Sequence, residues 1–355
     1  MLISRAKSSA VGALLLSLSA ALAPTPRAHA AAARQAERVP ESGVAQLVER
    51  ARRGALGAEE YARALAVGYA LVGGGRFREA AELFDALVLL RPRERAALYG
   101  AALATFNAGR PADAEPLARR AAEVALAEGA AKGRESDAAD ALVLLAVVLA
   151  VRGDVAGALA ASGRATALAP GNFDARLAHG RALYGAGDDA GAARAFRAAA
   201  ALRPGDPRPL FFLASTLERA GDDAGALAAY RELAAAQPRA PEGHLGLGAL
   251  LVKRGGAEAE EGIRALARAV EIDPELYEAR VTLGRALVAR GRAAEAVEHL
   301  RRAAALAPGN PEPHYQLSLA YRRLGRREEA AAESAVVKRI HESRRTAPAP
   351  PAPER

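Results

Sequence analysis

The chain has 355 residues, of which 4% are aromatic, and it contains neither Trp nor Cys. The absence of Cys excludes disulfides, thiolate metal sites, a Cys nucleophile and a lipid-modified N-terminal Cys. A core made largely of Ala and Leu favours close helix-on-helix packing over a sandwich or barrel, which β-branched and aromatic residues suit better. The formal net charge of +8 is consistent with nucleic-acid binding, but the N-terminal segment argues against that function.

The first 30 residues have the three parts of a secretory signal. Arg5 and Lys7 form a positive start, residues 10–23 form an apolar stretch, and residues 28–30 read Ala-His-Ala, which fits the cleavage pattern. We expect cleavage after Ala30, a periplasmic or secreted protein, and no stable membrane insertion afterwards; an uncleaved membrane anchor is the alternative. Cleavage removes three basic residues and no acidic one, which lowers the net charge from +8 to +5. An exported chain of this charge is not expected to bind nucleic acid.

Residues 31–60 precede the periodic part of the chain. We expect residues 31–40 to be disordered. Val44, Leu47, Val48 and Ala51 recur at helical spacing and predict one short helix. This helix would cap the apolar side of the first repeat, because a terminal repeat has only one neighbour.

A proline recurs in the part of the chain that follows, at nearly regular intervals from Pro170 to Pro308. It stands in LLRPRE, ALAPGN, ALRPGD, AAQPRA, EIDPEL and a second ALAPGN, as Pro92, Pro170, Pro204, Pro238, Pro274 and Pro308. From Pro170 onward the spacings are 34, 34, 36 and 34 residues. The string GDDAGA also recurs after 34 residues, at 187–192 and 221–226. A fixed period of this length predicts an architecture of stacked repeats.

Each unit of 34 residues predicts two helices. When the recurring proline is numbered 32, positions 4, 7, 8 and 11 form one helix face, and positions 20, 24 and 27 form a second. Positions 8 and 20 are small, as in Gly68 and Ala80, which would let the two helices touch. Position 15 is usually Gly, as in Gly187, and predicts a left-handed residue that ends the first helix.

Polar residues at the expected helix starts predict N-caps. Asp188 and Asp222 follow the glycine that ends the first helix, and each would cap the second helix. In the two copies of ALAPGN, the proline stops the second helix, and Asn172 or Asn310 would cap the helix that follows. Pro311 then fits the first helical position.

This pattern resembles the tetratricopeptide repeat (TPR) family. The resemblance implies an all-α fold, namely a right-handed superhelical α-solenoid of antiparallel helix pairs. Eight units cover residues 61–94, 95–138, 139–172, 173–206, 207–240, 241–276, 277–310 and 311–344. The second unit carries ten additional residues, EGAAKGRESD at 128–137, which we expect after its second helix, and the sixth carries two near Gly256. The Pro/Ala-rich tail, residues 345–355, is expected to be disordered.

The sequence offers weak candidates for catalysis or metal binding. The Asp pairs at 188–189 and 222–223 precede helices, so capping explains them better than metal binding. Residues 73–75 are three glycines but lack the spacing of a phosphate-binding loop. The histidines have no metal-binding spacing, and no nucleophile motif is present. We therefore predict a protein that is not an enzyme and that needs no cofactor or metal.

The resemblance also implies a concave groove lined by the first helices, with positions 2, 5, 9, 12 and 13 facing it. The early units place apolar residues there, and the later units place Arg and Lys there with aromatic residues among them. The apolar residues are Leu65, Tyr69, Val72, Tyr99, Leu103, Phe106, Val143 and Val147. We predict a partner-binding groove at Tyr69, Tyr99, Phe106, Arg181, Tyr184, Phe211, Arg219, Lys253, Arg285, Tyr315 and Arg322. The alternative is that much of the apolar strip is buried between adjacent helices.

These observations predict a scaffold that holds a partner protein in its groove, in cell-envelope assembly, secretion or export. The basic later units favour a partner segment that carries acidic residues there and aliphatic ones toward the early units. One alternative is a structural protein that self-associates into a homo-oligomer through its last helix or its apolar groove. Another is an accessory module that binds an acidic glycan along Arg181, Arg219 and Arg285.

Overall fold

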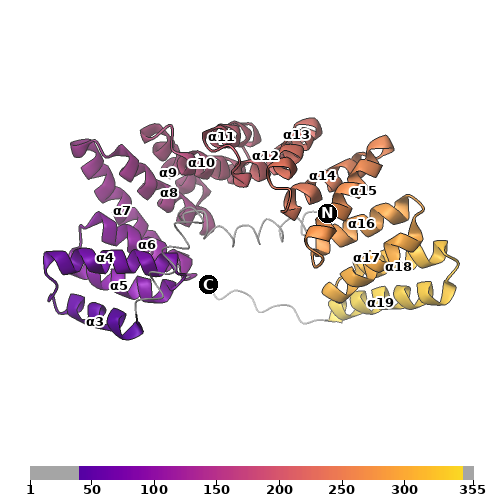
Figure 1. Cartoon of the computed structure of the whole chain (residues 1–355), viewed down its shortest axis with the longest axis horizontal. Coiled ribbons are helices and arrows are strands. Elements are labelled where there is room, and N and C mark those ends of the chain that lie inside the picture. The colour runs from indigo at the N-terminus through magenta and orange to yellow at the C-terminus, as the bar shows by residue number, and fades with distance from the viewer. Residues whose placement is uncertain (1–39, 347–355) are drawn as a thin grey trace. The chain divides into compact units, whose positions relative to one another are not determined.

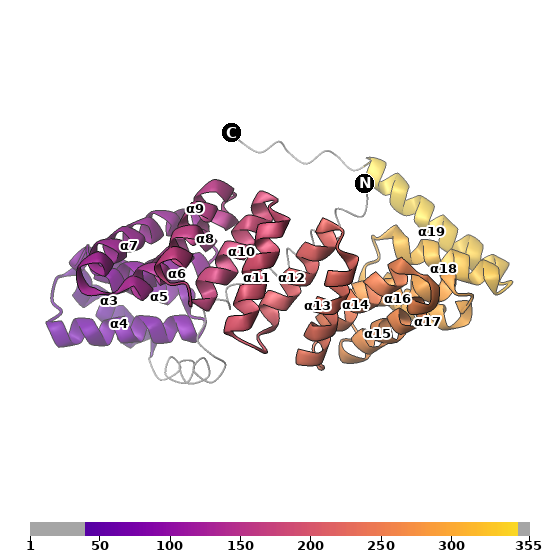
Figure 2. The same ribbon diagram turned by 90° about the horizontal axis from the view of Figure 1, so that it is seen from above.

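A computed structural model describes residues 40–346. The expected signal segment at 1–30 and residues 347–355 of the tail lie outside the described residues. The described part is built from helices, and no strand occurs in it. Consecutive helices pack in antiparallel pairs (Figures 1 and 2), and the chain divides into two units, Met1–Pro204 and Gly205–Arg355. This architecture confirms the predicted all-α solenoid of helix pairs.

Unit 1 begins with the predicted capping helix, α3 (Glu41–Arg52), which packs against α5 and buries Val44, Val48 and Ala51. Helix pairs then follow in chain order. They are α4 (Ala58–Gly73) with α5 (Phe77–Leu90), α6 (Arg95–Asn107) with α7 (Pro111–Lys132), α8 (Glu135–Val151) with α9 (Val155–Leu168), and α10 (Phe173–Ala186) with α11 (Asp189–Leu202).

Unit 2 continues the same alternation of first and second helices. Its pairs are α12 (Pro207–Ala220) with α13 (Asp223–Ala236), α14 (Pro241–Arg254) with α15 (Ala259–Ile272), α16 (Tyr277–Ala289) with α17 (Ala293–Leu306), and α18 (Pro311–Arg323) with α19 (Arg327–Thr346). The two additional residues of the sixth repeat form a short 3-10 turn, η2 (Gly256–Glu258), between α14 and α15.

The helix ends follow from local chemistry. Gly187 has φ 82°, a left-handed conformation that costs glycine little and lets the chain reverse after α10. The carboxylate of Asp188 then accepts a hydrogen bond of 2.8 Å from the backbone N–H of Gly191. Asn172 caps α10 and Asn310 caps α18 in the same way. The predicted caps are therefore confirmed, and capping accounts for the Asp pairs.

Glycines on the first helices make room for one large side chain on several of the second helices. A Cβ atom added to Gly68 on α4 would lie 2.6 Å from the Phe84 ring, and one added to Gly100 on α6 would lie 2.4 Å from it. Phe84 is fully buried on α5. Its ring therefore packs against the backbones of both neighbouring first helices, which brings α4, α5 and α6 close together.

The ten additional residues of the second repeat lengthen helices and do not form the expected loop. Residues 128–132 continue α7, which reaches 22 residues, and residues 135–137 begin α8 early. Gly133 makes the turn with φ 63°. Gly129 permits close approach, because its Cβ would lie 3.3 Å from the carbonyl oxygen of Arg134. The expected position of this insert, after the second helix, was therefore wrong, because the Ala-rich segment continues the helix it follows.

The surface of α19, the last helix, is suited to the end of a stack of repeats. On α17, Val297, Leu300 and Ala303 are buried in the stack. The residues 34 positions later on α19 are Ala331, Ser334 and Val337, and the first two are exposed while Val337 is half-buried. A small and polar outer seam is what a terminal repeat needs, because no further repeat covers it.

The close approach of α14 to α15 in unit 2 can be tested by adding a methyl group at Gly248. We expect Gly248→Ala to lower the free energy of unfolding by about 1–3 kcal/mol. Its Cβ would lie 2.7 Å from the carbonyl oxygen of Gly262 and 2.9 Å from the backbone nitrogen of Leu266. Gly309→Ala is the control, since nothing lies within 4 Å of its Cβ. Urea unfolding followed by circular dichroism would measure both, and equal stability of the two variants would contradict the packing argument.

Candidate functional site

The first helices define one face of each unit. In unit 1, α4 contacts α6, α6 contacts α8 and α8 contacts α10, and in unit 2, α14 contacts α16 and α16 contacts α18. Within the described chain, no comparably extensive contacts join successive second helices. The row with the closer spacing lies on the inner side of a curved stack. We call the surface formed by the first helices of a unit its inner face.

The predicted groove residues of unit 1 are packed more tightly than an open strip requires. Tyr69 donates a hydrogen bond of 2.8 Å to the carbonyl of Ala96 and packs edge-on against Phe84. Tyr99 and Phe106 are half-buried and pack against the core. Arg181 and Tyr184 are also half-buried, on α10. These side chains present edges to the inner face and bury the rest.

The apolar strip expected across the first three repeats is therefore largely core. Leu103 is buried, and Val143 and Val147 are only 2% and 7% exposed. Leu65 and Val72 are half-buried and pack against the same clusters. Burial between adjacent first helices, the alternative left open by the sequence, explains this strip. The physical reason is the small residues on these helices, which draw neighbouring helices together over the valines.

The predicted groove residues of unit 2 are more accessible. Tyr315 on α18 is 48% exposed. Arg285 on α16 is exposed and has no hydrogen-bond or ion-pair partner in the described chain. Lys253 is exposed and lies 3.8 Å from Asp223, and the guanidinium of Arg322 donates to the hydroxyl of Ser318 at 3.1 Å.

The other two predicted residues of unit 2 lie on α12. Phe211 is half-buried and packs edge-on against Phe212, with ring centroids 5.8 Å apart, and Arg219 is exposed near the end of the helix. Arg219 and Arg285 thus lie in unit 2, whereas Arg181, the third arginine of the glycan hypothesis, lies in unit 1.

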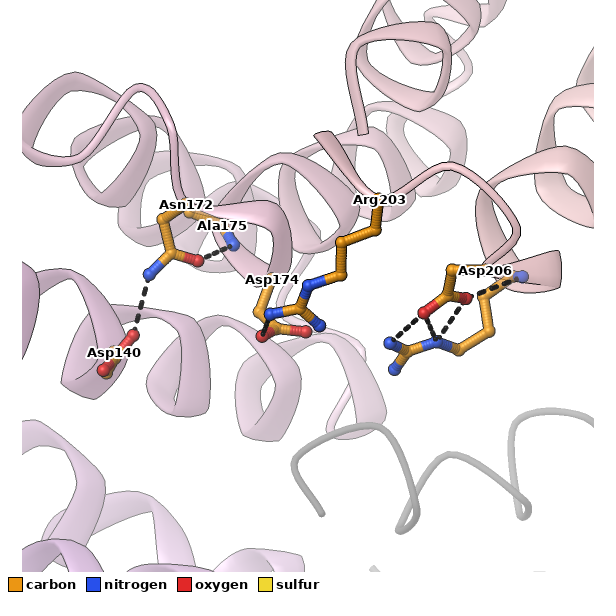
Figure 3. Close-up of polar contacts among 7 residues, drawn as sticks. Asp140, Asn172, Asp174, Ala175, Arg203 and Asp206 are labelled. Atoms are coloured by element: carbon orange, nitrogen blue, oxygen red, sulfur yellow. Dashed lines mark hydrogen bonds and ion pairs between the residues drawn. The ribbon is translucent and has the colours of Figure 1, made fainter. Parts of the chain in front are cut away.

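A group of polar contacts lies where the first helices of unit 1 begin. Figure 3 shows Asn172 between α8 and the start of α10. Its Oδ1 accepts from the backbone N–H of Ala175 at 3.0 Å, and its Nδ2 donates to Oδ1 of Asp140 at 2.8 Å. Beside it, Arg203 donates to Asp174 at 3.3 Å. The cap of α10 therefore also holds a carboxylate of the neighbouring first helix in place.

We call Asp137, Asp140 and Asp174 the acidic edge of unit 1. Burial raises the pKa of Asp140 above the ordinary value, and the nearby carboxylates of Asp174 and Asp137 raise it further, although the Asn172 hydrogen bond lowers it. Asp140 is nevertheless exposed to solvent. The ring of Tyr99 lies close by, since Asp140 and Asp174 add to the effect of burial in raising its pKa.

Unit 2 carries acidic residues at the corresponding positions of its first helices. They are Glu242 on α14, Glu278 on α16 and Glu312 on α18. Glu242 and Glu278 have no ion-pair partner among residues 40–346, whereas Glu312 accepts from the Gln316 amide at 3.0 Å. The hydroxyl of Tyr277 is buried without a hydrogen-bond partner in this part of the chain. Burial, with Glu312 and Glu278 nearby, raises the pKa of Tyr277 to about 12.

The described residues include no group of three or more His, Asp or Glu side chains arranged to hold a metal ion. Between residues 40 and 346, no helix is both long and apolar enough to cross a bilayer.

Sequence reasoning missed the role of Asp140, and it recognised Asn172 only as a cap. The two residues are 32 positions apart. A usable signal was present, because both Asp140 and Asp174 occupy position 2 of consecutive repeats and must therefore lie on the same face.

Asp140→Asn tests the desolvated carboxylate. Since the folded-state pKa of Asp140 is raised, its ionisation disfavours folding above that pKa, and the penalty vanishes below the ordinary value of 3.8, where both states are protonated. We expect the variant to be more stable at pH 7, by no more than about 1 kcal/mol because exposed charges are screened, and to match the parent at pH 3. Thermal unfolding at pH 7 and pH 3 measures these stabilities, and Glu123→Gln is the control. If Asp140→Asn is less stable than the parent at pH 7, the hydrogen bond from Asn172 to the carboxylate contributes more than the desolvation of that carboxylate costs.

Comparison with known proteins bears on the whole repeat region. No curated protein matches the chain in sequence. The solved structures that resemble the fold include those of two proteins. One is the crystal structure of MamA, with 22% identity over 50% of this chain and 98% of that chain and a TM-score of 0.46. The other is YrrB, described as a TPR protein with an unusual peptide-binding site, with 18% identity over 51% and 92% and a TM-score of 0.45. A MamA fragment from Desulfovibrio magneticus RS-1 has 20% identity over 48% and 96%, with a TM-score of 0.44.

Family models give the assignment. A model described as a tetratricopeptide repeat matches residues 65–131, 153–207 and 177–241, and a model described as a TPR repeat matches 284–325. Together these matches cover more than half of the chain, and they fall on the helix pairs described above. The chain therefore belongs to the tetratricopeptide repeat family.

Proposed function

We propose that this protein is a non-catalytic scaffold that binds segments of partner proteins on its inner faces. The proposal rests on charged side chains on the inner face of unit 2 that form no ion pair within the described chain. Glu242, Glu278 and Arg285 have no ion-pair partner in the described chain, and Tyr315 on the same face is 48% exposed. Aromatic and arginine side chains are enriched among residues that dominate protein interfaces.

The opposite side of unit 2 contrasts with this face. On its second helices and turns, Arg302 pairs with Glu275 at 2.5 Å, Arg231 with Glu261 at 2.9 Å, and Arg292 with Glu295 at 2.6 Å. These pairs neutralise one another, although single charges on the second helices, such as Arg264, also have no ion-pair partner in the described chain. The inner face differs in that its unpaired charges lie on the same side as an accessible aromatic ring, that of Tyr315.

A stack of this kind suits binding, because its helices are held rigid before the partner arrives. Side chains fixed on packed helices lose little freedom on association, so weak contacts spread over several repeats add to a useful affinity. Self-association through α19 is the weaker alternative, because the outer seam of that helix is small and polar.

The place of action that we propose is outside the cytoplasm, in envelope assembly, secretion or export. The motivation is the secretory pattern of residues 1–30, which lie outside the described residues. Mass spectrometry of the protein recovered from an envelope fraction tests this, and we expect a chain that begins at Ala31. Recovery of the full-length chain in membranes would contradict cleavage and favour an anchor.

The binding proposal is tested by capture of partners from envelope extract with residues 31–355. We expect a specific protein to be retained by the parent and lost by a Phe211→Ala/Arg285→Glu variant, which removes an inner-face ring and reverses an unpaired charge. Arg264→Glu is the matched control, because Arg264 is exposed on the second helix α15 and also lacks an ion-pair partner in the described chain. Equal capture by parent and inner-face variant would place the binding site elsewhere.

A further inference from the structure

One stripe of α8 runs across the inner face of unit 1 and differs at its two ends. Asp140, Val143, Val147 and Val151 are spaced 3, 4 and 4 residues apart, so they lie on one side of the helix. The two middle valines are buried, whereas Asp140 is exposed and Val151 is 48% exposed. At 1.5 Å per residue, the two accessible ends are about 17 Å apart. The face therefore presents an acidic site and an apolar site with a packed floor between them.

The apolar end extends to the neighbouring residues. Val155, at the start of α9, is 37% exposed. Phe106, at the end of α6, is half-buried and packs against the core cluster that contains Val143. Val151 is the last residue of α8 and Val155 the first of α9, and a partner that removes such exposed valines from water gains free energy.

The acidic end has one carboxylate more than its arginines neutralise. Asp137 pairs with Arg95 at 3.0 Å, and Asp174 pairs with Arg203 at 3.3 Å. Asp140 accepts the neutral amide of Asn172 and forms no ion pair in the described part of unit 1, although the more distant charge of Arg95 also acts on it. A cation supplied by a partner would complete this arrangement without displacing an existing pair.

The lengthened helices of the second repeat fix this edge. Glu128 on the added turns of α7 lies 3.7 Å from Arg95 at the start of α6 and 3.8 Å from Arg134 in the turn. Together with Asp137 at the early start of α8, these contacts tie the extension to the first helices beside Asp140. The acidic edge is therefore bordered by the lengthened parts of α7 and α8 and not by a loop.

We propose that the inner face of unit 1 docks an amphipathic helix of a partner protein, with Lys or Arg on one flank against Asp140 and aliphatic side chains on the other flank against Val151 and Phe106. This inference rests on the proposed function and names the partner chemistry for unit 1. A helix with its side chains is about 10–12 Å wide, and apolar atoms in contact lie about 4 Å apart, so side chains on its two flanks come within contact distance of both ends of a stripe of about 17 Å. A flank rich in acids would meet Asp140 with the same sign of charge.

A designed peptide provides the probe. It has about 18 residues of Leu, Ala and Lys, with the lysines along one flank of a helix and the leucines along the other. Two comparison peptides replace every Lys by Glu or scramble the order while keeping the composition. Fluorescence anisotropy with residues 31–355 gives the three affinities, and we expect the Lys-flank peptide to bind about tenfold more tightly than either of the others.

Variants of the protein locate the contact. Asp140→Lys is expected to lower the affinity for the Lys-flank peptide by about tenfold, and Val151→Ser to lower it about threefold through lost apolar contact. Glu123→Lys is the control for charge, because Glu123 is exposed on the second helix α7 and has no partner in the described chain. The inference is overturned if the Glu-flank peptide binds as well, if no peptide binds, or if Asp140→Lys and Glu123→Lys have equal effects.

The peptide experiment on unit 1 and the capture experiment on unit 2 can fail independently of each other. Should the inner-face variant of unit 2 lose its partner while Asp140→Lys leaves peptide binding unchanged, only the inference about unit 1 fails. Should the inner-face variant of unit 2 capture the same proteins as the parent, the inner face of unit 2 is not their binding site, and the peptide result then stands as a property of unit 1 alone.

Discussion

The packing of one large side chain against glycine or alanine holds the repeats of each unit together. Phe84 lies against the backbones at Gly68 and Gly100, so one ring joins the two helices of its own repeat to the first helix of the next. Tyr230 packs against Gly246 in the same manner in unit 2. Since an added methyl group would collide at each contact, the glycines set how closely the first helices approach, and that spacing determines the rest of each unit.

Close spacing of the first helices has consequences for the surface they form. It buries Val143 and Val147, which a looser stack would expose, and on α8 it leaves Asp140 and Val151 as the accessible residues of that stripe. Acidic residues suit the starts of helices, because the positive end of the helix dipole stabilises them. A partner that lies across an inner face therefore meets acids along one edge and apolar or basic groups along the other.

Ion pairs complete the division between the two sides of the stack. Arg152 pairs with Glu115 at 2.6 Å, joining the turn after α8 to the second helix α7. Such exposed pairs contribute at most about 1 kcal/mol each, so they are not the source of stability. They neutralise part of the charge on the outer side, and on the inner face charges such as Arg285 have no ion-pair partner within the described chain.

The sequence by itself determined the period, the helix limits and the caps. These features are local, because a Gly that needs a positive φ, an Asn or Asp that accepts a nearby N–H, and an apolar repeat each act within a few residues. Only the tertiary structure decided which inner-face residues are accessible. Burial of Val147 and the contact between Asp140 and Asn172 depend on how closely neighbouring helices approach, and that distance is set by side chains about one repeat away in the sequence. The helical continuation through residues 128–132 follows from local helix propensity, but the close approach of Gly129 to the carbonyl of Arg134 is visible only in the tertiary structure.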